Sequence, residues 1–246
     1  MSRSYDFLIS ALRTLSEKPP DDAAQSAKKA YSERMSAVVA SAFAEDLRQR
    51  GLIGTRPTSP GDEAGISGAE GRMSGGIGAK KVDVTWSTEQ SGLQLALSVK
   101  CINFKDRRGR NYQKNVVNRR GDMLFESVTL HRRFPYAVLG GFLLLDRGAA
   151  EDASSRRNST FVNTHRRLRL FSGRTDPAGR DEQYEHLYVA LIEATPSSAT
   201  AQLFRAGDSE REVQLDDAFD ELLTLVAERN PDFYEFVDGR LRRVQP

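Results

Sequence analysis

One carboxylate, one hydroxyl and one amine lie in two neighbouring stretches of the chain, in a spacing that could support metal-dependent chemistry. Asp83 lies in KKVDVTW, and Ser98 and Lys100 lie in LQLALSVK, a short polar segment later. A carboxylate and a backbone carbonyl, here that of Val99, can together hold Mg²⁺. The ion would polarise a phosphate and help to generate hydroxide, while a nearby lysine orients the attacking water or offsets negative charge in the transition state. This set of groups is consistent with phosphodiester hydrolysis.

Residues 80–105 are predicted to form the β-hairpin that positions these groups, because apolar and polar side chains alternate on both sides of a polar turn. Alternate side chains of a strand point to the same face of the sheet. Pairing Trp86 with Leu93 would place Asp83 opposite Ala96. The face predicted to carry the chemistry then contains Asp83, Ser98 and Lys100.

The arrangement of Asp83, a hairpin and then Ser98-Val99-Lys100 resembles the core of the PD-(D/E)xK nucleases, and in particular of type II restriction endonucleases. The resemblance implies a restriction-endonuclease-like α/β fold, Mg²⁺ as cofactor and cleavage of double-stranded DNA by a homodimer. It assigns Asp83 and the Val99 carbonyl to the metal and Lys100 to the nucleophile. Val82 stands where proline is usual, and Ser98 stands in place of the second acid. The alternative interpretation of the motif is an ordinary half-exposed hairpin.

The missing second carboxylate has two candidates. In nucleases of this type a helix before the aspartate strand often brings a glutamate to the metal, and Glu45 lies at the edge of the apolar stripe of a helix predicted to begin near residue 21 and end near residue 50. We therefore expect Glu45 to bind metal, although a boundary glutamate paired with an arginine is the competing interpretation. Glu126, in a helix predicted over residues 111–133, is the second candidate.

The remaining periodicities predict a single α/β domain with a mixed central sheet flanked by helices. We divide it into N-terminal helices (1–53), a glycine-rich loop (54–79), a catalytic α/β core (80–205) and a C-terminal helical segment (206–246). Apolar runs predict core strands over 136–145 and from His186 onward, and a short partner strand over 199–204. Helices are predicted over 5–16, 161–171 with a cap at Ser159 or Thr160, and 216–229.

Charge is distributed unevenly, although the net charge is only +2. Residues 100–133 contain ten basic and three acidic side chains, residues 153–175 contain six arginines and no acid, and residues 208–238 contain eleven acids and two arginines. This asymmetry predicts one positive face able to bind a phosphate backbone. The residues expected to contact DNA are Lys105, Arg107, Arg108, Arg110, Lys114, Arg119, Arg166, Arg167 and Arg169.

Composition excludes several other classes of protein. No apolar run is long enough to span a bilayer, and the N-terminus lacks the order of a secretion signal, so we expect a soluble cytoplasmic protein with no membrane partner. One cysteine, Cys101, rules out an internal disulfide. The three histidines have no ligand-like spacing, and His165 is expected at the surface or boundary. Any metal should therefore be a hard ion bound by oxygen.

Three functions are compatible with these observations. The first is a type II restriction-like endonuclease. The second is a DNA-binding or regulatory protein on the same scaffold, inactive because Ser98 replaces an acid. The third has no nucleic acid, and the charge asymmetry serves a protein–protein interface.

Overall fold

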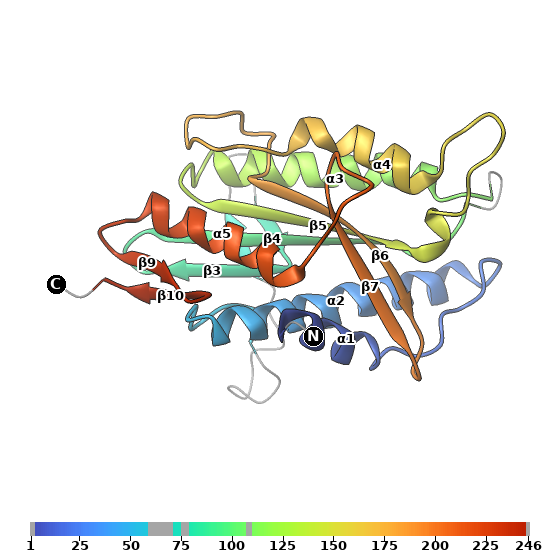
Figure 1. The fold of residues 1–246 in the computed structure, drawn as a ribbon, viewed down its shortest axis with the longest axis horizontal. Helices are drawn as coiled ribbons and strands as arrows, with labels where there is room; N and C mark the ends of the chain where they lie inside the picture. Colours follow the sequence, from blue (N-terminus) through green and yellow to red (C-terminus); the bar gives the residue numbers. More distant parts are fainter. Residues whose placement is uncertain (1–2, 59–70, 75–78, 107–109, 245–246) are drawn as a thin grey trace.

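The computed structural model describes residues 3–58, 71–74, 79–106 and 110–244. Within them, six strands form a sheet in the order β3-β4-β5-β6-β7-β8 (Figure 1). β4, β5 and β6 are mutually parallel and the other neighbours are antiparallel, so the predicted α/β class with a mixed central sheet is confirmed. The strands are β3 (Val84–Thr88), β4 (Gly92–Ile102), β5 (Val138–Asp146), β6 (His186–Ala194), β7 (Ala199–Arg205) and β8 (Glu212–Val213).

The β3–β4 hairpin confirms the predicted strands but differs from the predicted register. Trp86 pairs with Leu95 and not with Leu93, because a β-bulge follows Trp86. Side chains alternate with a period of two, so a shift of two residues leaves each of them on its predicted face. Asp83 and Lys100 therefore still lie on the same side of the hairpin.

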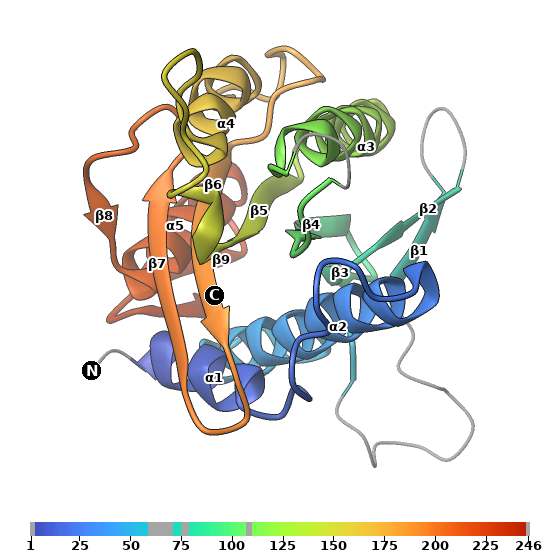
Figure 2. The ribbon, with the colours of Figure 1, turned by 90° about the vertical axis from the view of Figure 1, so that its right-hand side faces the viewer.

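Helices cover both faces of the sheet (Figures 1 and 2). On one face, Phe43 and Phe219 pack on Phe142 of β5, with ring centroids 4.8 and 6.1 Å away. On the other face, Met123 and Phe161 belong to a second apolar core. The first face is covered by α1 (Arg3–Leu12), α2 (Gln25–Gln49) and α5 (Leu215–Arg229), and the second by α3 (Gln113–His131) and α4 (Thr160–Leu168). None of the described helices is both long and apolar enough to cross a membrane.

The chain connecting β4 to β6 follows the prediction closely. α3 lies between β4 and β5 in sequence, and α4 lies between β5 and β6. Ser159 caps α4, since its Oγ accepts a hydrogen bond from the Val162 amide at 3.3 Å. Two short 3₁₀ helices, η1 (Arg147–Ala149) and η2 (Arg169–Phe171), lie before and after α4 within the β5–β6 connection. Parallel strands require such helical crossovers, which explains the alternation of helices and strands here.

Two predicted segments contain strands that were not expected. In the segment predicted as a glycine-rich loop (54–79), β1 (Gly71–Ser74) pairs with β2 (Ala79–Val82), while residues 75–78 lie outside the described part of the chain. The C-terminal segment (206–246) is helical only in α5, because it also contains β8 and a hairpin of β9 (Tyr234–Val237) and β10 (Arg240–Arg243). Asp238 and Gly239 form the turn, with φ of 52° and 72°.

Candidate active site

Asp83 occupies the break between β2 and β3, at the edge of the sheet. The β3–β4 pairing ends where Val84 meets Leu97, so the rest of β4 has no β3 partner on that side. The Asp83 carboxylate takes the place of a strand there, since its Oδ2 accepts a hydrogen bond from the Val99 amide at 2.7 Å. The same oxygen lies 2.8 Å from Nζ of Lys100. The structure thus brings the two predicted residues together in one contact.

The second carboxylate beside Lys100 comes from α3. Glu126 Oε2 lies 3.3 Å from Lys100 Nζ, so one ammonium joins both acids. The side chains of Asp83 and Lys100 are 17% and 14% exposed, whereas that of Glu126 is only 3% exposed. Glu126 is therefore the inner member of the group, behind Lys100.

Burial and mutual charge set the protonation of this group. Burial alone would lower the pKa of Lys100, but Glu126 and Asp83 together raise it above its ordinary value, so the side chain stays an ammonium. Burial raises the pKa of Glu126, against the attraction of Lys100 and together with the repulsion of Asp83. The Glu126 carboxyl therefore holds a proton more readily than an ordinary glutamate does, and a cation beside it would favour its ionised form.

The donor set suits a hard divalent ion. In an extended strand the N–H and C=O of one residue point to the same side, so the Val99 carbonyl is directed toward the open edge beside Asp83. Glu126 Oε1 and Ser98 Oγ are buried and make no hydrogen bond of good geometry with a described residue, although the Ser98 hydroxyl lies close enough to the Glu126 carboxyl to lower its pKa. Buried polar atoms without partners are costly, and a hydrated ion would satisfy them. All these donors are oxygens. The described residues contain no group of three or more histidine, cysteine, aspartate or glutamate side chains placed to bind a metal, so the Val99 carbonyl and water would have to complete the ligand set.

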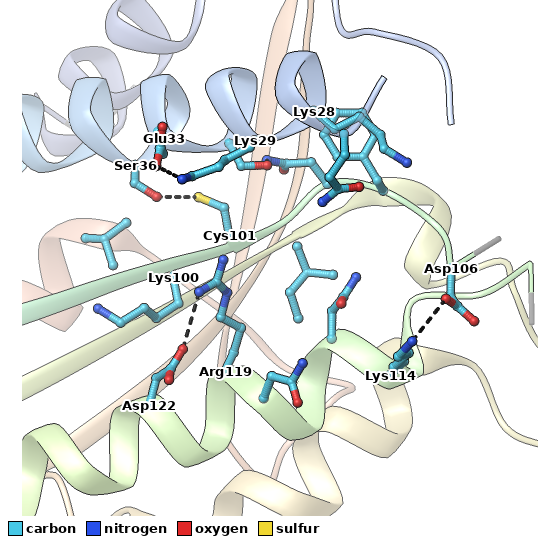
Figure 3. Close-up of a pocket in the computed structure, with 18 of the residues that line it drawn as sticks. Lys28, Lys29, Glu33, Ser36, Lys100, Cys101, Asp106, Lys114, Arg119 and Asp122 are labelled. Carbon is cyan, nitrogen blue, oxygen red and sulfur yellow. Dashed lines mark hydrogen bonds and ion pairs between the residues drawn. The ribbon is translucent and has the colours of Figure 1, made fainter. Parts of the chain in front are cut away.

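A cleft of about 880 Å³ opens onto Asp83, Val99 and Lys100, whereas Ser98 and Glu126 are buried beneath it and do not line it. We call it the α2–α3 cleft. One wall is the N-terminal half of α2 (residues 25–37), the other is the N-terminal half of α3 (residues 114–122), and the floor is Asp83 with residues 99–106 (Figure 3). Lys100 projects from the floor in the same view. Cys101 points the other way, toward α2, where its Sγ lies 3.2 Å from Ser36 Oγ.

Glu45 does not join the group, which corrects the prediction that it supplies the second carboxylate. Its Oε2 lies 2.8 Å from Nη2 of Arg48, and its Oε1 accepts a hydrogen bond from Gln49 at 3.3 Å. Only the N-terminal half of α2 lines the cleft, and Glu45 lies two turns beyond Ala37, the last residue that does. The competing interpretation, a boundary glutamate paired with an arginine, describes Glu45 correctly.

The predicted DNA-binding residues separate into three sets. Lys105, Lys114 and Arg119 line the cleft. Arg107 and Arg108 lie outside the described residues. The others do not line the cleft: Arg110 precedes α3, and Arg166, Arg167 and Arg169 lie at the C-terminal end of α4. α4 packs on the sheet away from the cleft, and the prediction that its arginines contact DNA stays a prediction.

Four other residues that line the cleft were not predicted from the sequence. Lys28 and Lys29 of α2 face the cleft, as do Asn115 and Asn118 of α3. The sequence signal was weak, because a lysine pair or an asparagine on a helix is equally typical of a solvated surface. Only the packing of α2 and α3 against β4 shows that these side chains share a cleft.

Comparison of the chain with protein-family models, with curated proteins and with solved structures found no match. The evidence for function is therefore the geometry of the Asp83, Lys100 and Glu126 side chains and of the α2–α3 cleft.

Proposed function

We propose that the protein is a Mg²⁺-dependent DNA endonuclease of the restriction type. The observation that carries the proposal is that Lys100 lies between two carboxylates at an open strand edge: Asp83, on the floor of a cleft with basic walls, and Glu126, buried behind Lys100. The same arrangement compensates for the main departure from the PD-(D/E)xK pattern, which is the serine in place of the second acid. Ser98 is not an acid, but α3 brings Glu126 to the place where an acid is needed.

Each residue of the group has a role in this proposal. Asp83, Glu126 and the Val99 carbonyl would hold the metal, which supplies Lewis-acid activation of the phosphate and of water when bound. Lys100 remains positively charged, so it orients the attacking water and offsets negative charge on the phosphate rather than removing a proton. Ser98 hydrogen-bonds water near the metal. Lys105, Lys114 and Arg119 bind the phosphates of the substrate.

Double-stranded DNA and a two-fold homodimer complete the proposal. Two-fold symmetric sites are matched by two-fold symmetric proteins, each subunit cutting one strand. This part rests on the resemblance to restriction endonucleases and on the basic cleft.

An inactive DNA-binding protein is the second candidate, and one observation favours it. The Lys100 ammonium already forms ion pairs with both carboxylates, at 2.8 and 3.3 Å. If those pairs persist, the acids are not released to a metal. The protein would then bind duplex DNA in a salt-dependent manner without cutting it.

Plasmid cleavage in Mg²⁺ separates the two candidates. The wild-type protein is expected to cut supercoiled plasmid in Mg²⁺ and not in EDTA, and Asp83→Asn and Lys100→Ala are expected to abolish cutting. Glu45→Gln is the matched control, because Glu45 is an acid that pairs with Arg48 and does not line the cleft. Cleavage that is unchanged in Asp83→Asn and Lys100→Ala would remove these residues from the mechanism. Binding without cleavage under any divalent ion would support the second candidate.

A further inference from the structure

The N-terminal half of α3 presents two amides between two cations. Lys114, Asn115, Asn118 and Arg119 all line the α2–α3 cleft. Their positions are i, i+1, i+4 and i+5, which share one face of a helix. Val116 is buried on another side of the helix and packs in the core. The spacing of the four residues and the packing of α3 thus fix this polar face toward the cleft.

The two amides are available to a ligand. Asn115 is partly buried and Asn118 is exposed, and neither side chain makes a hydrogen bond or ion pair with another residue in the described part of the chain. An asparagine amide offers one acceptor and two donor hydrogens together. In the major groove this combination matches the N7 acceptor and N6 donor of adenine.

The two cations are held only loosely, at the ends of the amide pair. Lys114 Nζ lies 3.8 Å from Asp106 Oδ1, and its side chain is 71% exposed. Arg119 Nη1 lies 3.3 Å from Asp122 Oδ2, and both side chains are at least 41% exposed. Figure 3 shows Arg119 extending from α3 toward β4, beside Lys100. Exposed ion pairs of this kind are weak, so phosphates can replace the acids.

We propose that α3 reads DNA sequence, with Asn115 and Asn118 contacting the base edges of A·T pairs next to the phosphate bound at Lys100, while Lys114 and Arg119 contact the flanking phosphates. The inference rests on the proposed function for the identity of the ligand. The proposed function does not say which residues select the DNA sequence or which base pair they prefer, and the role of α3 supplies both. The two central amides would select the base sequence, and the two flanking cations would hold the protein in place on the phosphate backbone. This is the usual division of contacts between a protein and DNA.

Selection from a duplex pool with randomised positions, carried out in EDTA, tests the inference without cleavage. The wild-type protein is expected to enrich a motif containing A·T pairs. Asn115→Ala and Asn118→Ala are each expected to lose preference at one position, by about 5- to 100-fold, with unchanged affinity for unrelated duplex. Lys114→Ala is expected to weaken binding to all sequences and to reduce the salt dependence by about one phosphate contact. Alanine favours helix, so these variants should fold, and circular dichroism checks that they do.

Asn163→Ala is the matched control, because Asn163 is an amide on α4 that does not line the cleft. The inference is overturned if Asn115→Ala and Asn118→Ala enrich the wild-type motif, if the motif contains only G·C pairs, or if no duplex is bound. The proposed function fails separately. If the enriched motif depends on Asn115 and Asn118 but the protein does not cleave DNA in Mg²⁺, the endonuclease proposal is wrong and the role of α3 in sequence recognition is retained. If the protein cleaves DNA in Mg²⁺ but Asn115→Ala and Asn118→Ala leave the motif unchanged, the endonuclease proposal is retained and the role of α3 is wrong.

Discussion

Glu126 of α3 lies 3.3 Å from Lys100 of β4, so the second acid of the candidate site comes from a helix and not from the strand that carries the lysine. In the proposed alignment with the PD-(D/E)xK pattern, Ser98 of β4 stands at the position of the second acid, and its side chain is buried. α3, the helix that connects the parallel strands β4 and β5, thus supplies beside Lys100 the carboxylate that β4 itself lacks.

Replacing Glu126 should therefore stop catalysis, and replacing Glu45 should not. We expect Glu126→Gln to reduce Mg²⁺-dependent plasmid cleavage by at least about 100-fold, because a neutral amide cannot offset the charge of the metal. Glu45→Gln should stay within a few-fold of the wild-type rate, since Glu45 pairs with Arg48 away from the cleft. Initial rates of supercoiled plasmid loss measure both variants. Equal losses of activity in the two variants would contradict the assignment of the second acid.

His165 should make the folded protein sensitive to acid. The side chain is buried against Phe161 and Phe204, and burial lowers its pKa to about 4, below the ordinary value of 6.5. The unfolded chain therefore binds a proton on His165 that the folded protein does not bind between pH 6.5 and pH 4. The free energy of unfolding falls as the pH is lowered through this window, by about 2 kcal/mol for this residue between pH 7.5 and pH 5.

Urea unfolding at pH 7.5 and pH 5 measures this effect. The wild-type protein is expected to lose more stability between the two values than His165→Leu, in which the titrating group is gone. If His165→Leu and the wild-type protein lose stability equally, then His165 does not titrate as its burial requires.

Arg50 should be important for stability, because it holds together helices from the two ends of the chain. Its guanidinium is 2% exposed and contacts Asp46 of α2 at 3.2 Å and Asp216 of α5 at 2.5 Å. Arg50→Met would leave the buried Asp46 with Arg3 as its remaining charged partner. We expect a loss of about 3 kcal/mol in the free energy of unfolding. Arg242→Met, which removes an exposed pair with Asp238, should change stability by less than about 0.5 kcal/mol. Similar losses in both variants would show that burial of the Arg50 network is not the cause.

The sequence allowed Asp83 and Lys100 to be placed together because strand alternation is a local rule. The predicted strand register was wrong by two residues. A shift by an even number of residues leaves each side chain on the same face of the sheet, so Asp83 and Lys100 still lie on the same side of the hairpin, as predicted. The positions of Glu45 and Glu126 depend instead on where each helix crosses the sheet. α2 presents its first half to the cleft and α3 presents residues 114–126 to the cleft and to Lys100, and a one-dimensional pattern does not contain that information.

Two other differences between the predicted and the observed structure had different causes. The β9–β10 hairpin could have been found, because Asp238-Gly239 is a strong hairpin turn signal between two short runs. His165 could not, since Phe204, which helps to bury it, comes from a strand about forty residues later in the chain. Long-range packing therefore explains why His165 is buried although Arg166 and Arg167 follow it directly in its own helix.

Titration of Mn²⁺, a spectroscopic substitute for Mg²⁺, tests the central claim most directly, because electron paramagnetic resonance separates free from bound ion without DNA or cleavage. The wild-type protein is expected to bind one ion per chain in the high-micromolar range or tighter, and Asp83→Asn and Glu126→Gln are each expected to weaken binding at least about tenfold. Glu45→Gln should bind as the wild-type protein does. Wild-type protein that binds no ion, or Asp83→Asn and Glu126→Gln variants that bind as tightly as wild type, would contradict the claim that these two carboxylates form a metal site.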